Sequence, residues 1–189
     1  GGGQPLIPKN WSEISTMTIS YGHGLSATPM HLAAAFATIA NGGRKISPTL
    51  VKQSGSNYGA QVMSPQVATL MNQMLRKVVT DGTASFGDVA GYAVGGKTGT
   101  ADKPKARGGY HKDKVIATFA SVFPANDPRY VLIVTLDEPE VYSMGENRRS
   151  AGWTAVPVAA EYINRIAPLL GLRPEVEPGK LAGITLTSN

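Results

Sequence analysis

The 189-residue sequence predicts an α+β fold in which an antiparallel sheet is flanked by helices. Two apolar segments predict the sheet, Val115 to Phe123 and Tyr130 to Leu136, because both are rich in β-branched and aromatic residues. The turn cluster Pro-Ala-Asn-Asp-Pro at 124–128 lies between them and indicates a hairpin loop. Two long strands joined this tightly must be antiparallel. Helical patterns with clear start and stop signals lie on both sides of the hairpin.

Two helices are predicted upstream of the hairpin. The first has Thr28 as its N-cap and Pro29 as its first helical residue, and it stops at Asn41-Gly42-Gly43. The second starts at Ser64-Pro65, carries apolar residues at helical spacing and ends before Gly82. Both helices therefore have boundaries that local chemistry dictates.

The region after the hairpin predicts a third helix from about Gly152 to Leu170. It is apolar on most sides, so it should be buried, and Pro157 indicates a kink or a helix start nearby. The polar, Gly-containing segment Glu140 to Arg149 suggests a mobile lid. Residues 172–189 lack periodicity and are expected to form a docked or disordered tail.

The segment Gly91 to Thr100 fits two unrelated chemistries. From Gly91 it spells G-x-x-x-x-G-K-T, the phosphate-binding P-loop pattern, which requires a helix directly after the Lys-Thr pair. Residues 99–109 contain three Gly and one Pro without helical apolar spacing, so that helix is not expected. The apolar run Val131 to Leu136 before Asp137-Glu138 resembles a magnesium-binding strand and keeps the nucleotide-binding alternative open as the less favoured one.

From Lys97 the same segment spells K-T-G-T, and Tyr92 to Ala101 is predicted to be a strand. Side chains alternate along a strand, so Thr98 and Thr100 should point to one face, and Lys97 and Gly99 to the other. Such an edge can receive an extended peptide through backbone pairing, with Gly99 allowing close approach. Its hydroxyls and ammonium can bind a terminal carboxylate.

Seven segments of the sequence resemble the transpeptidase domain of class B penicillin-binding proteins, and their order and spacing agree with that family. The resemblance runs from about residue 11 to about residue 171, and is nearest to the division-specific peptidoglycan D,D-transpeptidases of Gram-negative bacteria. It implies a partial penicillin-binding protein/serine β-lactamase-like fold. The matching segments are Thr16–Leu25, Thr28–Ala33, Val79–Thr83, Gly91–Ala101, Ala117–Phe119, Pro128–Tyr130 and Asp137–Pro139.

The resemblance implies a role for each residue of the K-T-G-T motif. Lys97 would belong to the proton network, and the backbone N–H of Thr100 would form half of the oxyanion hole. Thr98 and Thr100, beside Gly99, would bind the carboxylate of a D-Ala-D-Ala stem peptide or a β-lactam. Tyr110 either lines the substrate cleft or only packs against the loop. No cofactor is implied.

The family also requires a nucleophilic Ser in S-x-x-K and a second element, S-x-N. No Ser in the sequence is followed by Lys three residues on or by Asn two residues on, and Ser54-Gly55-Ser56-Asn57 has the wrong spacing. We therefore expect a fragment, a cleaved piece or a redesigned version of a longer protein, which alone should not acylate. A folding or interaction fragment is the alternative to an enzyme module. The expected organisation is a linker or tag remnant at 1–10, the C-terminal portion of the domain at 11–171 and a tail at 172–189.

Composition and charge bear on nucleic-acid binding and on membrane insertion. The net charge of +5 comes partly from two basic clusters, 103–107 and 148–149, which lack interleaved aromatic residues and predict solvated loops, not a nucleic-acid surface. The sequence has no cysteine and no apolar run of about 18 residues that could span a membrane. By resemblance, the protein would act at the periplasmic face of the inner membrane, anchored by an N-terminal helix absent here, with division-machinery membrane proteins as partners.

The remaining polar candidates favour structural roles. His23, His31 and His111 are too dispersed for a zinc site, so no metal is predicted, and His23 between two glycines is expected to be structural. Asp137-Glu138 could serve in acid–base chemistry, but the favoured interpretation is an acidic pair that ends a strand and holds the following loop.

Overall fold

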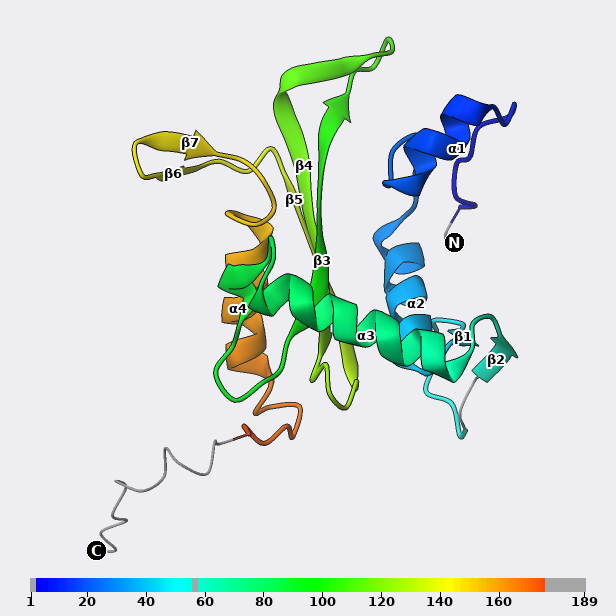
Figure 1. The fold of residues 1–189 in the computed structure, drawn as a ribbon, viewed down its shortest axis with the longest axis vertical. Helices are drawn as coiled ribbons and strands as arrows, with labels where there is room; N and C mark the ends of the chain where they lie inside the picture. Colours follow the sequence, from blue (N-terminus) through cyan, green and yellow to red (C-terminus); the bar gives the residue numbers. More distant parts are fainter. Residues whose placement is uncertain (1–2, 56–57, 176–189) are drawn as a thin grey trace, which may run out of the picture.

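The computed structural model describes residues 3–55 and 58–175, and these form a three-stranded sheet between helices (Figure 1). Two short hairpins project from this arrangement. The elements in chain order are α1 Glu13–Ser20, α2 Pro29–Ala40, β1 Arg44–Ile46, β2 Tyr58–Gln61, α3 Pro65–Thr80, the 3-10 turn η1 Ser85–Gly87, β3 Gly95–Pro104, β4 Tyr110–Phe123, β5 Tyr130–Asp137, β6 Val141–Ser143, β7 Glu146–Arg148 and α4 Ala155–Ile166.

The sheet has the strand order β3-β4-β5, and both pairs are antiparallel, which confirms the predicted hairpin and the α+β class. Phe119 in the middle of β4 lies opposite Thr98 of β3 and Val134 of β5. The motif strand begins at Gly95, three residues later than predicted from Tyr92. The reason is a tight turn before it, which an antiparallel bridge between Val89 and Tyr92 closes.

One face of the sheet packs on α4 and makes the core. Phe119 and Ile163 are fully buried in this core, and Val79 of α3 joins them. Figure 1 shows α4 and α2 on opposite sides of the three strands, with α3 crossing beside β3. Burying large apolar side chains is worth about 1.5–3 kcal/mol each, so the packing of α4 on the sheet stabilises the fold.

The caps predicted for α2 and α3 are confirmed. The hydroxyl of Thr28 accepts a hydrogen bond from the backbone N–H of His31, and Ser64 does the same for Val67. His31 completes a capping box, because its Nδ1 accepts from the backbone N–H of Thr28. His31 therefore has a local structural role.

The third predicted helix is shorter than expected, since α4 begins at Ala155 and ends at Ile166. A Cβ on Gly152 would lie 2.6 Å from the carbonyl oxygen of Thr83, so the turn at 151–154 is pressed against the end of α3 and cannot simply extend α4. Pro157 falls in the first turn of α4, where a missing N–H leaves no helical bond unmade.

Three short features were not predicted from the sequence. Helix α1 is capped by Ser12, whose hydroxyl accepts from the N–H of Ser15. The β1–β2 pair follows α2, and β6–β7 occupies the segment expected to be a lid. In β6–β7 the two loop residues Met144 and Gly145 have positive φ angles of 54° and 80°, the geometry of a type I′ hairpin turn.

The two ends of the described chain are tied to the body. Leu6, within the expected linker, exchanges two backbone hydrogen bonds with Ser26. Glu175 of the expected tail donates its N–H to the carbonyl of Gly91, and its carboxylate accepts from the amide of Asn126. Residues 1–2 of the linker, 56–57 and 176–189 of the tail lie outside the described residues. None of the helices that the structure describes is long and apolar enough to cross a bilayer.

Candidate active site

The K-T-G-T motif lies on β3, at one edge of the sheet. Its four residues pair with Ala117 to Ala120 of β4, and no strand of the described chain pairs with the other edge of β3. The outer backbone groups of β3 are therefore free to pair with an extended ligand. At the start of the strand α3 covers one face of the sheet, since a Cβ on Gly95 would meet the backbone of α3 at Arg76 and Leu75.

The two threonines of the motif point to the α4 side and each has one partner there. Thr98 Oγ1 lies 2.8 Å from the hydroxyl of Thr83, and Thr100 Oγ1 accepts a hydrogen bond of 2.9 Å from the backbone N–H of Ala151. Thr83 and Ala151 lie 15 and 51 residues away from their partners in the sequence. Neither residue was predicted from the sequence to be a site residue, and the matching segment Val79–Thr83 was the only indication.

These contacts leave hydroxyl protons available. A hydroxyl group donates one hydrogen bond and accepts up to two. The Thr83–Thr98 pair uses one of its two protons internally, and Thr100 uses an acceptor lone pair, so its own proton is free. The edge thus offers two O–H donors, a set that suits the two oxygens of a carboxylate.

Lys97 and Gly99 point to the opposite side, toward α2. The ammonium of Lys97 donates to the carbonyl oxygen of Thr98 over 2.7 Å, and its side chain is exposed. A Cβ on Gly99 would have no atom of the described chain within 4 Å. Both positions therefore border open space.

Tyr110 is not brought together with the threonines. It lies opposite Pro104, six residues beyond Thr98, which is about 20 Å along a strand. Its ring is 5.4 Å from the ring of His23, which in turn stacks on Tyr21 at 6.4 Å. This aromatic cluster joins the loop after α1 to the far end of the β3–β4 hairpin.

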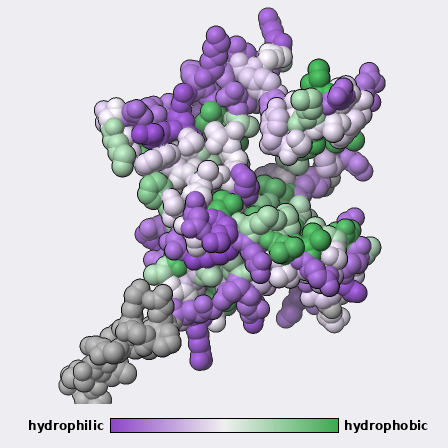
Figure 2. Space-filling view, viewed as in Figure 1, coloured by the Kyte–Doolittle hydropathy of each residue, from purple (hydrophilic) through white to green (hydrophobic). Residues whose placement is uncertain are grey.

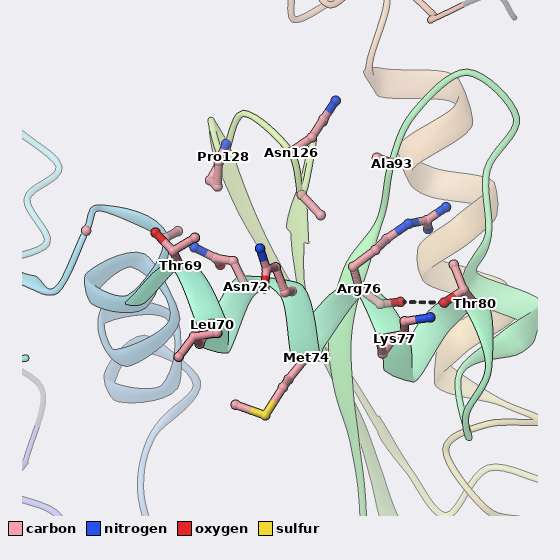
Figure 3. A pocket seen from close by; sticks show the side chains of 14 residues that line it. Thr69, Leu70, Asn72, Met74, Arg76, Lys77, Thr80, Ala93, Asn126 and Pro128 are labelled. Atoms are coloured by element: carbon pink, nitrogen blue, oxygen red, sulfur yellow. Dashed lines mark hydrogen bonds between the residues drawn. The ribbon is translucent and has the colours of Figure 1, made fainter. Parts of the chain in front are cut away.

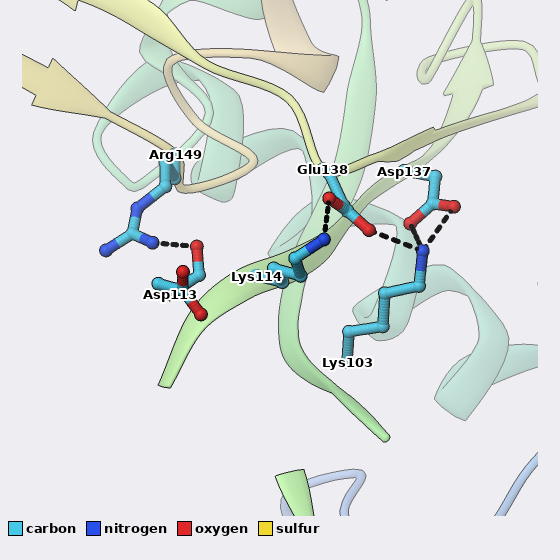
Figure 4. Close-up of polar contacts among 6 residues, drawn as sticks. All are labelled: Lys103, Asp113, Lys114, Asp137, Glu138 and Arg149. Carbon is cyan, nitrogen blue, oxygen red and sulfur yellow. Dashed lines mark hydrogen bonds and ion pairs between the residues drawn. The ribbon is translucent and has the colours of Figure 1, made fainter. Parts of the chain in front are cut away.

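A ladder of charges crosses the same end of the sheet (Figure 4). Lys103 of β3 binds both Asp137 and Glu138, and Lys114 of β4 binds Glu138, with N–O distances of 2.7 to 2.8 Å. Hydrogen bonds from Lys103, and then from Lys114, lower the pKa of Glu138 to about 2. The bonds to Asp137 and then Glu138 raise the pKa of Lys103. The acidic pair ends β5 at Asp137, as predicted, but its carboxylates tie three strands together and do not hold the following loop.

Two consecutive arginines hold the β6–β7 hairpin, Arg148 at the end of β7 and Arg149 directly after it. The guanidinium of Arg148 lies 5.0 Å from the ring centre of Trp153 and pairs with Glu146, while Arg149 donates to the carbonyl of Asp113 (Figure 4). With Lys103 engaged as well, three residues of the two basic clusters are bound within the chain. The prediction that both clusters are solvated loops is therefore wrong for Lys103 and Arg148, which lie in β3 and β7 and are paired with acidic side chains.

A separate groove runs between α3 and the β4–β5 turn, with a volume of about 1080 Å³. Figure 3 shows Asn126 and Pro128 of the turn across from the side chains of α3, including Arg76. None of the four motif residues lines it. In residues 3–55 and 58–175, no three His, Asp or Glu side chains gather in the manner of a metal site.

The nucleotide-binding alternative is wrong. Residues 99–104, which would have to open a helix, continue β3 as an antiparallel strand. Asp137 ends a strand as that alternative required, but its carboxylate is occupied by Lys103. An antiparallel sheet with Lys-Thr-Gly-Thr at its edge and a buried C-terminal helix behind it instead fits the penicillin-recognising class of proteins.

Comparison with known proteins supports this class. Residues 2–163 match the family model of the penicillin-binding protein transpeptidase domain. The chain is 34% identical over 190 residues to a probable peptidoglycan D,D-transpeptidase FtsI of Caulobacter vibrioides, and covers 31% of that protein. The chain therefore belongs to the penicillin-binding protein transpeptidase family.

Solved structures agree. The transpeptidase domain of Burkholderia pseudomallei penicillin-binding protein 3 matches 91% of this chain with a TM-score of 0.79 and 35% identity, and 51% of that domain is covered. Penicillin-binding protein 3 of Mycobacterium tuberculosis, solved with ampicillin, matches with a TM-score of 0.77 at 28% identity, and 42% of it is covered. The 189 residues thus correspond to about half of a transpeptidase domain.

Proposed function

We propose that this chain is the substrate-binding half of a serine-type D,D-transpeptidase that cross-links peptidoglycan during cell division. The observation that carries the proposal is the Lys97-Thr98-Gly99-Thr100 motif on an unpaired sheet edge, in a chain of the transpeptidase family. Neither S-x-x-K nor S-x-N occurs in the sequence, so the nucleophile has to come from a polypeptide segment outside these 189 residues.

Substrate binding follows from the hydrogen-bond inventory of the edge. A stem peptide ending in D-Ala-D-Ala, or a β-lactam, would pair its backbone with β3 beside Gly99. Its terminal carboxylate would accept the free protons of the Thr83–Thr98 pair and of Thr100. The fixed partners of both hydroxyls reduce the rotamer entropy lost on binding.

In the chemical step, the Ser oxygen attacks the penultimate carbonyl carbon and forms a tetrahedral intermediate. The Thr100 N–H and the N–H of the nucleophile would bind its oxyanion, and each such donor is worth about 3–4 kcal/mol. The C–N bond then breaks, the terminal D-Ala leaves as an amine after taking a proton, and an acyl ester remains. The amine of a second strand attacks this ester, which forms the cross-link and frees the Ser. Lys97, on the open side of the sheet, would carry positive charge and relay protons there.

Tyr110 has a different place in this scheme. Because it lies about 20 Å along the strand from Thr98, it would contact the part of a long substrate that is distant from the terminal carboxylate. The completed domain is this chain joined to the remaining half of the Burkholderia transpeptidase domain. Small β-lactams should therefore acylate its Tyr110→Ala variant as fast as they acylate the unchanged domain. A large loss would show that the cleft folds back toward the carboxylate site.

We place this activity at the periplasmic face of the inner membrane, with membrane proteins of the division machinery as partners. The support is the naming of its relatives as peptidoglycan D,D-transpeptidases. The alternative, a folding or interaction fragment without chemistry of its own, is favoured only by the missing nucleophile motifs.

The test is covalent labelling by a fluorescent penicillin, read by intact mass. The chain alone should give no adduct. The chain joined to the remaining half of the Burkholderia domain should give a stoichiometric adduct, and Lys97→Ala or Thr98→Val should reduce its rate at least tenfold. An adduct on the chain alone would overturn the proposal, and so would unchanged labelling rates in both the Lys97→Ala and Thr98→Val variants. If the joined protein gives no adduct, the fragment alternative is favoured.

A further inference from the structure

Three aromatic side chains form a cluster at the far end of the motif strand, and no chemical step of the proposed reaction uses them. The rings of Tyr21 and His23 stack with 6.4 Å between their centres, and the ring of His23 lies 5.4 Å from that of Tyr110. Tyr21 is 73% exposed and Tyr110 is 48% exposed. The three residues are here called the aromatic platform, because two of the rings present a large part of their surface to solvent.

The platform is held in place from both of its ends. The backbone N–H of His23 donates to the carbonyl of Thr18 over 3.0 Å, which fixes the loop after α1. In the β3–β4 hairpin, the N–H of Lys105 donates to the carbonyl of Gly109, and the N–H of Gly108 donates to that of Lys105. A binding surface whose backbone is already ordered loses little conformational entropy when a ligand binds.

The free edge of β3 leads to this platform. Tyr110 pairs with Pro104 at the end of β3, and α1 lies on the side of β3 that faces away from β4 (Figure 1). In the proposed reaction the substrate carboxylate reaches Thr98, and the carbonyl under attack lies at the N–H of Thr100. The rest of an extended peptide therefore continues past Thr100 toward the platform.

The length of a stem peptide matches the distance to the platform. A stem peptide of roughly five residues spans about 17 Å when it is extended. Pro104 comes five residues after Gly99, the centre of the carboxylate site, and this is also about 17 Å along a strand. The first residue of the peptide, and the sugar to which it is linked, would therefore arrive at the level of Tyr110.

Sugar rings suit exposed aromatic side chains. One face of a pyranose ring carries several C–H groups and is apolar, whereas its hydroxyl and acetamido groups point outward from the ring. The face of an aromatic ring carries partial negative charge and attracts such C–H groups. The tyrosine hydroxyls and the histidine nitrogens can donate hydrogen bonds to the polar groups of the sugar and accept hydrogen bonds from them.

The surroundings of the platform favour a polar ligand. Lys105, Arg107 and Lys112 of the β3–β4 hairpin are exposed, and Figure 2 shows hydrophilic side chains gathered over the hairpin tip at the top of the view. An apolar protein partner would have to remove water from these charged groups, which is costly. A sugar can cover the aromatic rings and leave the charged groups in water.

We propose that the aromatic platform binds an amino sugar of the glycan strand that carries the stem peptide. The proposal rests on the proposed function, because the direction and the length of the ligand are taken from it. The motif strand would hold the peptide end of the substrate, and the platform would hold its sugar end. A substrate that is held at both ends is oriented at its reacting carbonyl.

Binding of the sugar can be measured without any chemical step. The probe is a tetrasaccharide of alternating N-acetylglucosamine and N-acetylmuramic acid without peptide, and its binding to the full 189-residue chain is measured by saturation-transfer NMR. Tyr21→Leu and Tyr110→Leu remove an aromatic face and keep an apolar side chain, whereas Tyr110→Phe keeps the face. Tyr142→Leu and Tyr58→Leu are the matched controls, since these tyrosines are 78% and 51% exposed on the other two hairpins.

We expect the Kd for the tetrasaccharide to rise at least fivefold in Tyr21→Leu and in Tyr110→Leu. In Tyr110→Phe and in both controls it should stay within twofold of the Kd for the unchanged chain. No binding to the unchanged chain, or equal affinities in all variants, would overturn the proposal. An equal loss in the controls would overturn it too, because the sugar would then stack on any exposed tyrosine. If urea unfolding shows that Tyr110→Leu does not fold, Tyr21→Leu decides alone.

A second measurement uses the completed domain and two substrates, a pentapeptide ending in D-Ala-D-Ala and the same pentapeptide linked to its disaccharide. The kcat/KM for release of D-Ala should be higher for the linked substrate, and the ratio of the two values should fall at least fivefold in Tyr21→Leu. An unchanged ratio would contradict the proposal. Penicillin labelling of the same samples separates the two proposals: sugar binding without an adduct supports the platform and counts against the proposed chemistry, and an adduct without sugar binding does the reverse.

Discussion

Two glycines on the motif strand should respond in opposite ways to the same methyl group. A Cβ on Gly96 would lie 2.6 Å from the carbonyl oxygen of Ala120 and 2.6 Å from the ring of Phe119. Ala120 belongs to the paired strand and Phe119 is fully buried, so neither can move without disturbing the core. Overpacking of a rigid site costs about 1–3 kcal/mol, and we expect the upper half of that range for Gly96→Ala.

For a chain of this size, about 2–3 kcal/mol corresponds to a fall of about 5–10 °C in Tm. The assay is urea unfolding followed by the fluorescence of Trp153, whose ring packs 5.0 Å from that of Phe86 beside the core. Gly99→Ala is the matched control, because its Cβ would meet no atom within 4 Å and its stability should stay within about 0.5 kcal/mol. An unchanged midpoint for Gly96→Ala would refute the packing argument. Loss of penicillin labelling by Gly99→Ala alone in the completed domain would assign Gly99 to substrate approach.

Three further predictions concern caps, charge and the hydroxyl pair. Thr28→Ala removes the hydroxyl that accepts from the N–H of His31 and should lower the free energy of unfolding by about 1 kcal/mol in urea unfolding, with Thr28→Ser retaining it. The pKa of Glu138 falls from 4.5 to about 2 on folding, so its stabilisation is complete above pH 4.5 and is lost as the pH falls toward 2. Glu138→Gln should therefore flatten the dependence of the urea midpoint on pH within that window, and a curve of unchanged steepness would contradict this. Thr83→Val should slow penicillin labelling of the completed domain about tenfold with little change in stability, and Thr83→Ser should keep the rate of the unchanged domain. Equal labelling rates for the unchanged domain and both variants would make the contact with Thr98 incidental.

The sequence was most informative where local chemistry decides the structure. The boundaries of α2 and α3 follow from Thr28, Ser64 and the prolines behind them, since a cap is a contact between residues three apart. The hairpin of β4 and β5 was predictable for the same reason, because a five-residue turn leaves no other way to pair the strands. The K-T-G-T strand could be told from a P-loop because residues 99–109 contain three Gly and one Pro and lack apolar residues at helical spacing.

What could not be predicted depends on contacts between distant residues. The start of α4 is set by the close approach of Gly152 to the carbonyl of Thr83, which no periodicity encodes. The same contact brings Thr83 and Ala151 to the threonines of the motif. Tyr110 was a candidate because it follows the motif closely in sequence, but a long hairpin carries it far from Thr98. Sequence proximity is a poor guide to a site on an extended strand, where each residue adds about 3.3 Å.

The two sides of the motif strand differ in how they are packed. The α4 side faces a buried core, whereas Lys97 and Gly99 on the α2 side border open space. Thr98 and Thr100 face the α4 side, where the chain itself supplies the partners that orient their hydroxyls. Lys97 and Gly99 face the α2 side, where the described chain supplies no such partner beyond the strand's own carbonyl. In the proposed mechanism, carboxylate recognition uses the first pair, whereas nucleophilic chemistry uses Lys97 of the second. Under the proposed function, the chain therefore holds its carboxylate-binding hydroxyls in place on its own, whereas the groups that would act with Lys97 come from the nucleophile-bearing segment.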